Sequence, residues 1–274
     1  MVSMIEVSGV RYCVADEGRG PAMLFVHGFP LDHTMWRHQL AQLTSDFRCL
    51  APDLRGFGKS TVTAGTVTME QFADDLAALL DALHISEPIV FCGLSMGGYI
   101  AWQFARRHSD RLKALILCDT RAVADTDEAA ANRLKLANDV LQQGPRIVAD
   151  AMLPRLFAPG TVQTRPEILE ETRQVILATS PAGIAAALRG MAQRPDARPW
   201  LPAISWPTLL LAGEHDAIST PDEMSDFARS ISNARLAIIP DAGHMTALEN
   251  ADAVTLAVRD FGTVIRSMSE GGTP

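Results

Sequence analysis

The chain is short of positive charge, and this limits what it can bind. Its 274 residues contain 24 lysines and arginines against 32 aspartates and glutamates, so the formal net charge is −8. An acidic excess disfavours nucleic acid and an anionic membrane surface as partners. No apolar run is long enough to span a bilayer. The first residues also lack the basic and apolar segments of a signal peptide. These absences predict a cytoplasmic protein.

Cysteine is scarce and shows neither metal-binding nor redox spacing. The four cysteines, Cys13, Cys49, Cys92 and Cys118, fall inside predicted strands without a Cys-x-x-Cys pair. We therefore expect buried thiols in a reducing compartment. There is no His-Glu-x-x-His motif, no clustered Cys/His set and no glycine-rich phosphate loop. The sequence predicts that the protein uses no metal and no other cofactor.

Apolar runs that read as strands alternate with amphipathic helical patterns over much of the chain. This alternation predicts a mostly parallel sheet with helices on both faces. We assign residues 1–119 and 206–268 to this core. The strands are expected at residues 5–7, 11–15, 22–26, 47–51, 89–92, 112–118, 207–212 and 234–239, and helices at 36–43 and 69–83.

Between residues 120 and 205 the alternation stops and the pattern becomes helical. Helices are expected at 127–141, 145–153, 166–178 and 181–191, with Gly144-Pro145, Ala158-Pro159-Gly160 and Arg165-Pro166 as breaks. This segment is interpreted as a helical cap inserted into the core. The tail, residues 269–274, is predicted to be disordered.

The most informative motif is Gly93-Leu94-Ser95-Met96-Gly97, which follows an apolar strand and precedes a helical pattern. A G-x-S-x-G sequence at such a junction is typical of a sharp turn that exposes a nucleophilic serine at the end of the sheet. Alone, the five residues would fit a serine that caps a helix. The strand and helix around them favour Ser95 as a catalytic nucleophile.

A nucleophilic serine needs a base, and the base needs an acid that orients it. Asp216 and His244 each follow a predicted strand, as Ser95 does. The carboxyl ends of parallel strands meet at one edge, which brings the three together. Glu214, Asp119 and Asp241 are alternatives for the acid. We rank Asp216 ahead of Asp119, the strongest of the three.

Acyl transfer also needs two backbone N–H groups aimed at the developing oxyanion. The residue after the nucleophile, Met96, is one candidate. Phe29, in the loop that follows the strand at 22–26, is the other. In the same loop, Gly28 allows a close backbone approach and Pro30 stiffens the chain. His27 is interpreted as a brace for the loop rather than as a catalytic group.

Five motifs in this order resemble those of the α/β-hydrolase superfamily over nearly the whole chain. They are His27-Gly28-Phe29-Pro30, the segment 53–60, Gly93-Leu94-Ser95-Met96-Gly97-Gly98, Gly213-Glu214-His215-Asp216 and Ala242-Gly243-His244. The resemblance implies a mostly parallel eight-stranded sheet with an inserted helical cap, and a structural role for the segment 53–60. It is closest to small bacterial carboxylesterases, enol-lactonases and cofactor-free haloperoxidase-like enzymes. The serine at position 95 separates the chain from members with an aspartate or cysteine nucleophile.

The resulting hypothesis is a serine hydrolase that cleaves small carboxylic esters or lactones through an acyl-enzyme on Ser95. Hydrolysis of C–C bonds, perhydrolysis and a non-catalytic ligand receptor of the same fold stay open as alternatives. The expected partner is a small ester or lactone, and the sequence leaves a homodimer open. Apolar cap and loop residues are predicted to line the substrate pocket: Met152, Leu153, Phe157, Met191 and Met245.

Overall fold

Eight strands form a single sheet in the computed structural model, which describes residues 2–270. In sheet order they are β1 (Val2–Val7), β2 (Val10–Glu17), β4 (Arg48–Pro52), β3 (Ala22–Val26), β5 (Ile89–Leu94), β6 (Leu112–Cys118), β7 (Thr208–Gly213) and β8 (Ala234–Ile239). Strand β2 runs against both of its neighbours, and all other pairs are parallel. The predicted mostly parallel sheet is confirmed.

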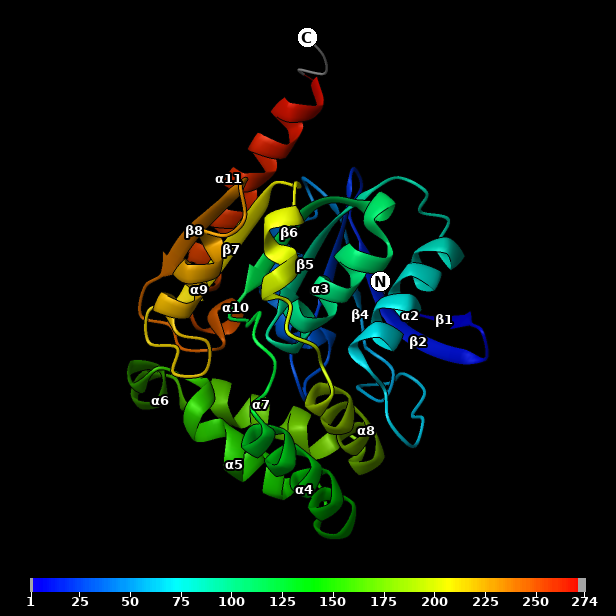
Figure 1. The fold of residues 1–274 in the computed structure, drawn as a ribbon, viewed down its shortest axis with the longest axis vertical. Helices are drawn as coiled ribbons and strands as arrows, with labels where there is room; N and C mark the ends of the chain where they lie inside the picture. The colour runs from blue at the N-terminus through cyan, green and yellow to red at the C-terminus, as the bar shows by residue number, and fades with distance from the viewer. Residues whose placement is uncertain (1, 271–274) are drawn as a thin grey trace.

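Helices cover both faces of the sheet, as its central strands require. Every residue of β5 and β7 is buried, so neither face of these strands meets solvent. Helix α1 (Arg37–Leu43) packs against α11 (Ala251–Glu270). Helix α2 (Met69–Ala82) packs against α3 (Met96–Arg107) (Figure 1). The shorter elements of the core are η1 (His33–Trp36), η2 (Ser109–Arg111), α9 (Pro221–Ala228) and α10 (Thr246–Glu249).

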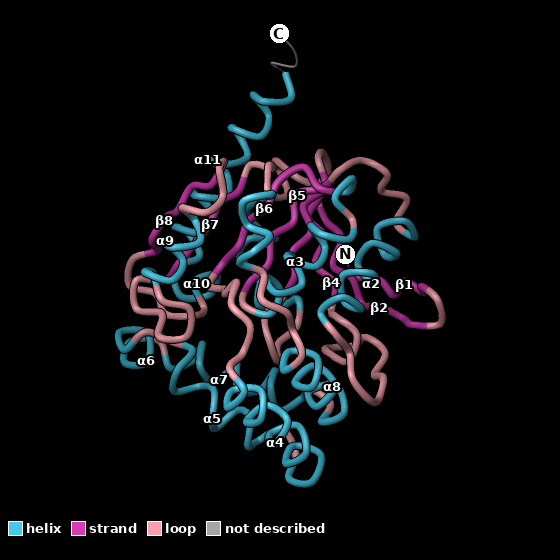
Figure 2. The backbone as a smooth tube through the Cα atoms, viewed as in Figure 1, coloured by secondary structure: helices cyan, strands magenta, loops and turns pink. Residues whose placement is uncertain are grey.

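The segment predicted as a cap is helical and lies beyond the carboxyl ends of the strands. It contains α4 (Asp127–Gln143), α5 (Arg146–Leu156), α6 (Pro159–Thr164), α7 (Pro166–Ala178), α8 (Pro181–Ala192) and η3 (Arg198–Ala203). Figure 2 shows the loops that connect these helices to the sheet. The break predicted at Ala158-Pro159-Gly160 does separate two helices, but it ends at Ala158, because α6 already starts at Pro159. Proline suits the first turn of a helix, where its missing N–H would have no partner.

Helix α8 attaches the cap to the core through two close backbone contacts. A Cβ on Gly183 would overlap the carbonyl oxygen of Gly56, and one on Gly190 would overlap the carbonyl oxygen of Val67. The Val67 N–H donates to the carbonyl of Ala186, 3.1 Å away, between these two points. Only glycine allows the helix backbone to approach the core loops this closely.

The C-terminal helix α11 continues to Glu270, so the prediction of a disordered tail from residue 269 is wrong for its first two residues. Residues 271–274 lie outside the described part of the chain. Among the described residues, no single helix has the length and apolar character to cross a membrane. Helices α7 and α8 have that length and apolar character only when taken together, and they are bent by 96° relative to each other.

All four cysteines are buried free thiols in strands, as the sequence predicts. Burial raises the pKa of Cys13 to about 11 and that of Cys49 to about 12. These thiols are therefore uncharged near neutral pH and pack as small apolar groups.

Candidate active site

Ser95 occupies the turn between β5 and α3 in a conformation that few non-glycine residues adopt. Its φ is 54° and its ψ is −111°. The turn is held by hydrogen bonds from the Ser95 N–H to the Cys118 carbonyl, 2.9 Å away, and from the Thr120 hydroxyl to the Ser95 carbonyl, 2.7 Å away. A Cβ on Gly97 would overlap the Val26 carbonyl oxygen, so glycine is needed for α3 to pack this close to β3.

The side chains of Ser95, His244 and Asp216 form a continuous hydrogen-bonded chain. His244 Nε2 lies 2.9 Å from Ser95 Oγ, and His244 Nδ1 lies 2.8 Å from Asp216 Oδ2. With the carboxylate ionised, Nδ1 carries the proton and Nε2 is free to accept one from the serine hydroxyl. His244 and Asp216 are each 3% exposed, which limits competition from water. The three residues predicted from the sequence are brought together in the geometry of a catalytic triad.

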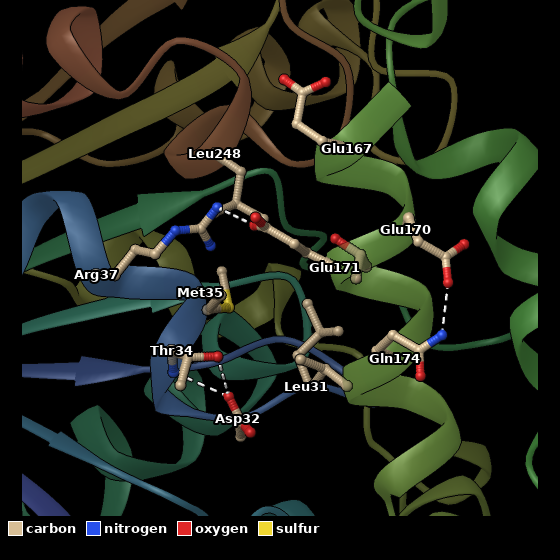
Figure 3. A pocket seen from close by; sticks show the side chains of 12 residues that line it. Leu31, Asp32, Thr34, Met35, Arg37, Glu167, Glu170, Glu171, Gln174 and Leu248 are labelled. Atoms are coloured by element: carbon tan, nitrogen blue, oxygen red, sulfur yellow. Dashed lines mark hydrogen bonds and ion pairs between the residues drawn. The ribbon is translucent and has the colours of Figure 1, made fainter. Parts of the chain in front are cut away.

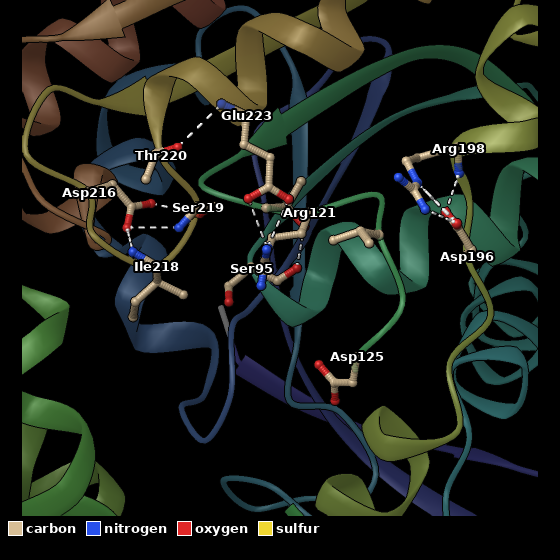
Figure 4. Close-up of polar contacts among 12 residues, drawn as sticks. Ser95, Arg121, Asp125, Asp196, Arg198, Asp216, Ile218, Ser219, Thr220 and Glu223 are labelled. Carbon is tan, nitrogen blue, oxygen red and sulfur yellow. Dashed lines mark hydrogen bonds and ion pairs between the residues drawn. The ribbon is translucent and has the colours of Figure 1, made fainter. Parts of the chain in front are cut away.

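The Asp216 carboxylate is held by more than its histidine. Oδ1 accepts hydrogen bonds from the Ile218 and Ser219 N–H groups, and Oδ2 accepts one from the Ser219 hydroxyl, 2.6 Å away (Figure 4). Burial by itself would raise the pKa of Asp216. The hydrogen bonds from His244, Ser219 and Ile218, with the attraction to His244, outweigh that effect and hold the pKa below its usual value. The acid is thus kept ionised beside the base.

Asp119, the strongest alternative for the acid, has a different role. Its Oδ1 accepts a hydrogen bond from the Gly213 N–H, 2.8 Å away, and its Oδ2 accepts a short one from the Thr246 hydroxyl. Burial and repulsion from Asp216 raise its pKa, so the negative charge favours Asp216. Asp119 therefore joins β7 to α10. The other two alternatives, Glu214 and Asp241, are exposed and contact each other through the Asp241 N–H.

The loop that carries Phe29 lies against the nucleophile. A Cβ placed on Gly28 would be 3.5 Å from the Ser95 Cβ. Neither the Phe29 N–H nor the Met96 N–H donates a hydrogen bond to a described residue, which leaves both free for a ligand. His27 braces this loop: its Nε2 accepts from the Leu54 N–H at 3.0 Å and its Nδ1 donates to the Gly28 carbonyl at 2.9 Å. Burial lowers the pKa of His27, as a neutral brace requires.

The segment 53–60 is structural, as expected from the sequence. Asp53 accepts hydrogen bonds from the backbone N–H groups of His33 and Lys59 and from His33 Nδ1. The Ser60 hydroxyl donates to the Asp53 carbonyl and accepts from the Cys13 N–H. These contacts tie the segment to β2 and η1.

Glu249 connects the loop of His244 to the cap, and sequence reasoning missed it. One carboxylate oxygen accepts from the Gly243 and Met245 N–H groups, which flank His244, at 2.8 and 3.2 Å. The other accepts from the Ala158 N–H and the Thr161 hydroxyl, both at 2.7 Å. This side chain is buried, with four donors satisfied. No local sequence pattern marks it, because its partners come from separate segments.

A cavity of about 240 Å³ opens onto Ser95 and His244 and is roofed by cap residues. Met152 and Met191 line it, as predicted. Leu153, Phe157 and Met245 do not; they are buried in the packing between cap and core, so the prediction for these three is wrong. Leu153 follows Met152 by one residue on α5 and so faces another direction. The Phe157 backbone lies against Gly243, where an added Cβ would be 2.8 Å from the Phe157 carbonyl carbon.

Two sets of side chains in the described part of the chain could reach a common metal ion. They are Cys13, His33 and Asp53, and the exposed set Glu214, His215 and Asp241. In the first set, Asp53 already accepts the three hydrogen bonds given above, and the pKa of Cys13 is raised, so no thiolate is at hand. Neither set includes a residue of the triad.

The family described as alpha/beta hydrolase fold matches residues 21–251. The chain belongs to the α/β-hydrolase family. Both the core strands from β3 onward and the entire cap lie within the matched range.

This α/β-hydrolase is similar to several characterised relatives over almost its full length. An esterase from Thermogutta terrifontis is 47% identical, with 97% of this chain and 99% of that chain covered and a TM-score of 0.94. The enol-lactonase from Burkholderia xenovorans LB400 is 34% identical, with 95% and 100% covered and a TM-score of 0.88. The 3-oxoadipate enol-lactonase 2 of Acinetobacter baylyi is 29% identical over 91% of each chain. All three are hydrolases by name, as is expected of the site described above.

Proposed function

We propose that the protein is a serine hydrolase that cleaves small carboxylic esters or lactones through an acyl-enzyme on Ser95. The observation that carries the proposal is the chain of hydrogen bonds from Ser95 Oγ through His244 to Asp216. The esterase and enol-lactonase names of the relatives support the substrate class. The cavity of about 240 Å³ is below the ~300 Å³ of typical drug-sized sites, which favours a small substrate.

In the proposed mechanism, Ser95 Oγ attacks the carbonyl carbon while His244 Nε2 takes the hydroxyl proton. The N–H groups of Phe29 and Met96 stabilise the negative oxygen of the tetrahedral intermediate. His244 then gives its proton to the departing alcohol oxygen, and the C–O bond breaks to leave an acyl group on Ser95. In the second half, His244 takes a proton from water, and the resulting attack releases the acid and restores the serine.

A fluorophosphonate probe and a substrate panel test the proposal together. We expect the probe to label Ser95, as read by mass spectrometry, and the protein to hydrolyse p-nitrophenyl esters or small lactones. Ser95→Ala should abolish labelling and lower kcat on the order of a millionfold. Circular dichroism should show an unchanged fold, because the substitution removes one hydroxyl from a strained turn.

The outcomes separate the proposal from its alternatives. A receptor of this fold would not react with the probe at Ser95. Retention of a tenth of the wild-type rate by Ser95→Ala would rule out the serine mechanism. Loss of activity in a chelator, restored by added metal, would contradict the proposed metal-free chemistry. The cytoplasmic location and the homodimer stay predictions.

A further inference from the structure

The catalytic cavity is positively charged, although the chain as a whole is acidic. Two arginines, Arg133 and Arg155, line it together with Ser95 and His244, and no carboxylate is among its lining residues in the described part of the chain. The formal net charge of the chain is −8. In an acidic protein, a cavity whose charged lining residues are all cations concentrates positive potential at the reacting groups.

Arg133 on α4 is held so that part of its guanidinium stays available. Its Nε lies 2.5 Å from Asp125 Oδ2, and its Nη1 lies 3.7 Å from the sulfur of Met191, another cavity residue. Its Nη2 has no hydrogen-bond partner among the described residues. The contact with Asp125 fixes the side chain, and Nη2 stays free for a ligand.

Asp125 does not neutralise Arg133, because it is shared with a second arginine. Arg194 Nη2 lies 2.7 Å from Asp125 Oδ1, and its guanidinium stacks over the cavity residue Tyr99 at 4.3 Å. Burial alone would raise the pKa of Asp125, but the hydrogen bonds from Arg133 and Arg194 outweigh it and hold the pKa low. One carboxylate faces two guanidinium groups, so the cluster carries one net positive charge.

Arg155 on α5 adds a second positive charge. It lines the cavity one turn of helix from Met152 and Ala151, and it makes no ion pair or hydrogen bond with a described residue. Most other cap arginines are paired, as Arg173 is with Asp150 at 2.7 Å. An unpaired guanidinium in the same cavity as the nucleophile is suited to bind an anion that arrives with the substrate.

We infer that the substrate carries an ionised carboxylate, which Arg133 and Arg155 bind while the ester or lactone carbonyl lies at Ser95. The inference rests on the proposed function and deepens it: the substrate class becomes half-esters of dicarboxylic acids and lactones that bear a carboxylate. Guanidinium groups bind carboxylates through charge-assisted, often paired hydrogen bonds. The arginines act on binding and position, and take no part in bond cleavage.

Matched esters that differ only in charge test the inference. Monomethyl glutarate carries the charge on the acyl side, and methyl glutaramate is its neutral amide of the same shape. Acetoxyacetate carries the charge on the alcohol side, with acetoxyacetamide as its neutral partner. At least one charged ester should exceed its amide in kcat/KM by about tenfold or more, the strength of a hydrogen bond to a charged group. Equal rates within both pairs would overturn the inference.

Arg155→Ala should lower kcat/KM for the favoured charged ester by ~10- to 100-fold, and the ratio of charged to neutral substrate should fall with it. Arg155→Lys should recover part of that ratio, because it restores the charge without the planar fork. Arg146→Ala is the matched control: Arg146 lies on the same helix, is exposed and lines no described cavity, so both rates should stay at wild type. An unchanged ratio in Arg155→Ala would contradict the assignment.

Binding to the inactive Ser95→Ala variant separates this inference from the proposed function. Isothermal titration calorimetry should show tighter binding of the favoured charged ester than of its amide, and adding Arg155→Ala should remove the difference. If the wild type hydrolyses no ester but this preference remains, the proposed function fails and the anion site stands. If the preference is absent, the anion site fails whatever the activity.

Discussion

Two of the cavities that lie where the cap meets the core have linings of opposite charge. The larger, about 650 Å³, is a groove between α7 and the η1–α1 segment (Figure 3). Its apolar walls include Leu31, Met35, Val175 and Leu248, and its carboxylates are Asp32, Glu167, Glu170 and Glu171. The catalytic cavity is less than half as large and is lined by arginines without carboxylates.

The two cavities differ in whether their polar groups have partners, which their sizes do not reveal. Most polar groups of the groove bind one another: Glu171 pairs with Arg37 at 2.7 Å, and Glu170 accepts from Gln174 at 2.5 Å (Figure 3). In the catalytic cavity, by contrast, the Arg155 guanidinium and the Phe29 N–H have no partner among the described residues. The N–H of Met96, the residue after Ser95, has none there either. Backbone N–H groups left free beside Ser95 mark a site for a ligand, whereas the ion pair of Arg37 with Glu171 joins the core to the cap.

The largest loss of activity is expected when the triad acid is substituted. Asp216→Asn should lower kcat by about four orders of magnitude, because the amide favours the wrong tautomer of His244. Asp119→Asn should cost much less, since Asp119 does not contact the histidine. In the groove, Glu171→Gln should leave kcat within about twofold of wild type, since one exposed ion pair contributes little. A larger loss in Asp119→Asn than in Asp216→Asn would transfer the role of acid to Asp119.

Glu249→Gln should show that hydrolysis depends on the attachment of the His244 loop to the cap. The amide nitrogen would face two of the four donors that the carboxylate now satisfies. We expect the free energy of unfolding to fall by about 2 kcal/mol. The kcat should fall by about 10- to 100-fold with little change in KM, because the loop of His244 loses its alignment. Urea denaturation and steady-state kinetics measure the two effects, and Glu171→Gln is the control. A variant with normal kcat would contradict a positioning role for Glu249.

Much of the catalytic cavity could be predicted from the sequence, for a physical reason. Ser95, Asp216 and His244 each follow a strand, and parallel strands bring such positions to one edge whatever the details of packing. Phe29 and Met96 also lie just after strands, β3 and β5, and could be predicted for the same reason. The rest depends on which direction a helix faces after it packs. Met152 and Leu153 are adjacent in sequence, and only the packed cap shows that the first meets the cavity and the second the core.

The same limit explains the residues that sequence reasoning missed. Arg155 is one of several cap arginines, and its sequence position does not reveal that it reaches the catalytic cavity. Glu249 acts through contacts with the cap segment at Ala158 and Thr161, which no local pattern joins to it. Ser219 lies only three residues from Asp216, and a serine at that spacing does not by itself indicate a partner of the acid. Conversely, the groove leaves no trace in the sequence, because its walls come from η1, α7 and α10.

The variants Met152→Ala and Phe157→Ala together test which side chains line the catalytic cavity. Met152 lines the cavity, so its truncation should raise kcat/KM for longer acyl chains by about tenfold, the scale of methylene discrimination in apolar pockets. Phe157 is buried between the cap and the core, so its truncation should lower the free energy of unfolding by ~3 kcal/mol or more. It should leave the chain-length profile unchanged. A panel of p-nitrophenyl esters with thermal unfolding distinguishes the two, and exchanged outcomes would show that the lining is misassigned.

The smallest effect is expected on the groove side, at the pair of His33 and Asp53. The hydrogen bond with Asp53 raises the pKa of His33 against the opposing effect of burial. Burial would raise the pKa of Asp53, but its bonds with His33 and Lys59 lower it. The histidine therefore stabilises the fold below its unfolded pKa, ~6.5, and this stabilisation is lost as pH rises through the raised folded value. The carboxylate stabilises above ~3.9 and loses its effect as pH falls through the lowered value.

His33→Gln should therefore lower the free energy of unfolding on the order of 1 kcal/mol at about pH 5, with a smaller deficit at about pH 8. Urea denaturation of both proteins across this range gives the difference directly. A deficit that grows as pH rises would contradict the assigned ion pair. Ester hydrolysis should be nearly unchanged, because the pair lies outside the catalytic cavity.

The two glycines of α8 restrict how caps can be exchanged between members of this family. Gly183 and Gly190 place the α8 backbone directly on the loops that hold Gly56 and Val67, so any side chain at these two positions would clash with those loops. A chimaera that takes α4 to α7 from a donor and keeps the native α8 preserves both contacts. A chimaera that replaces α8 must import the two recipient loops as well, or place glycines at the same two points. In engineering, the junction for a transplanted cap thus lies before α8, although by chain order α8 belongs to the cap.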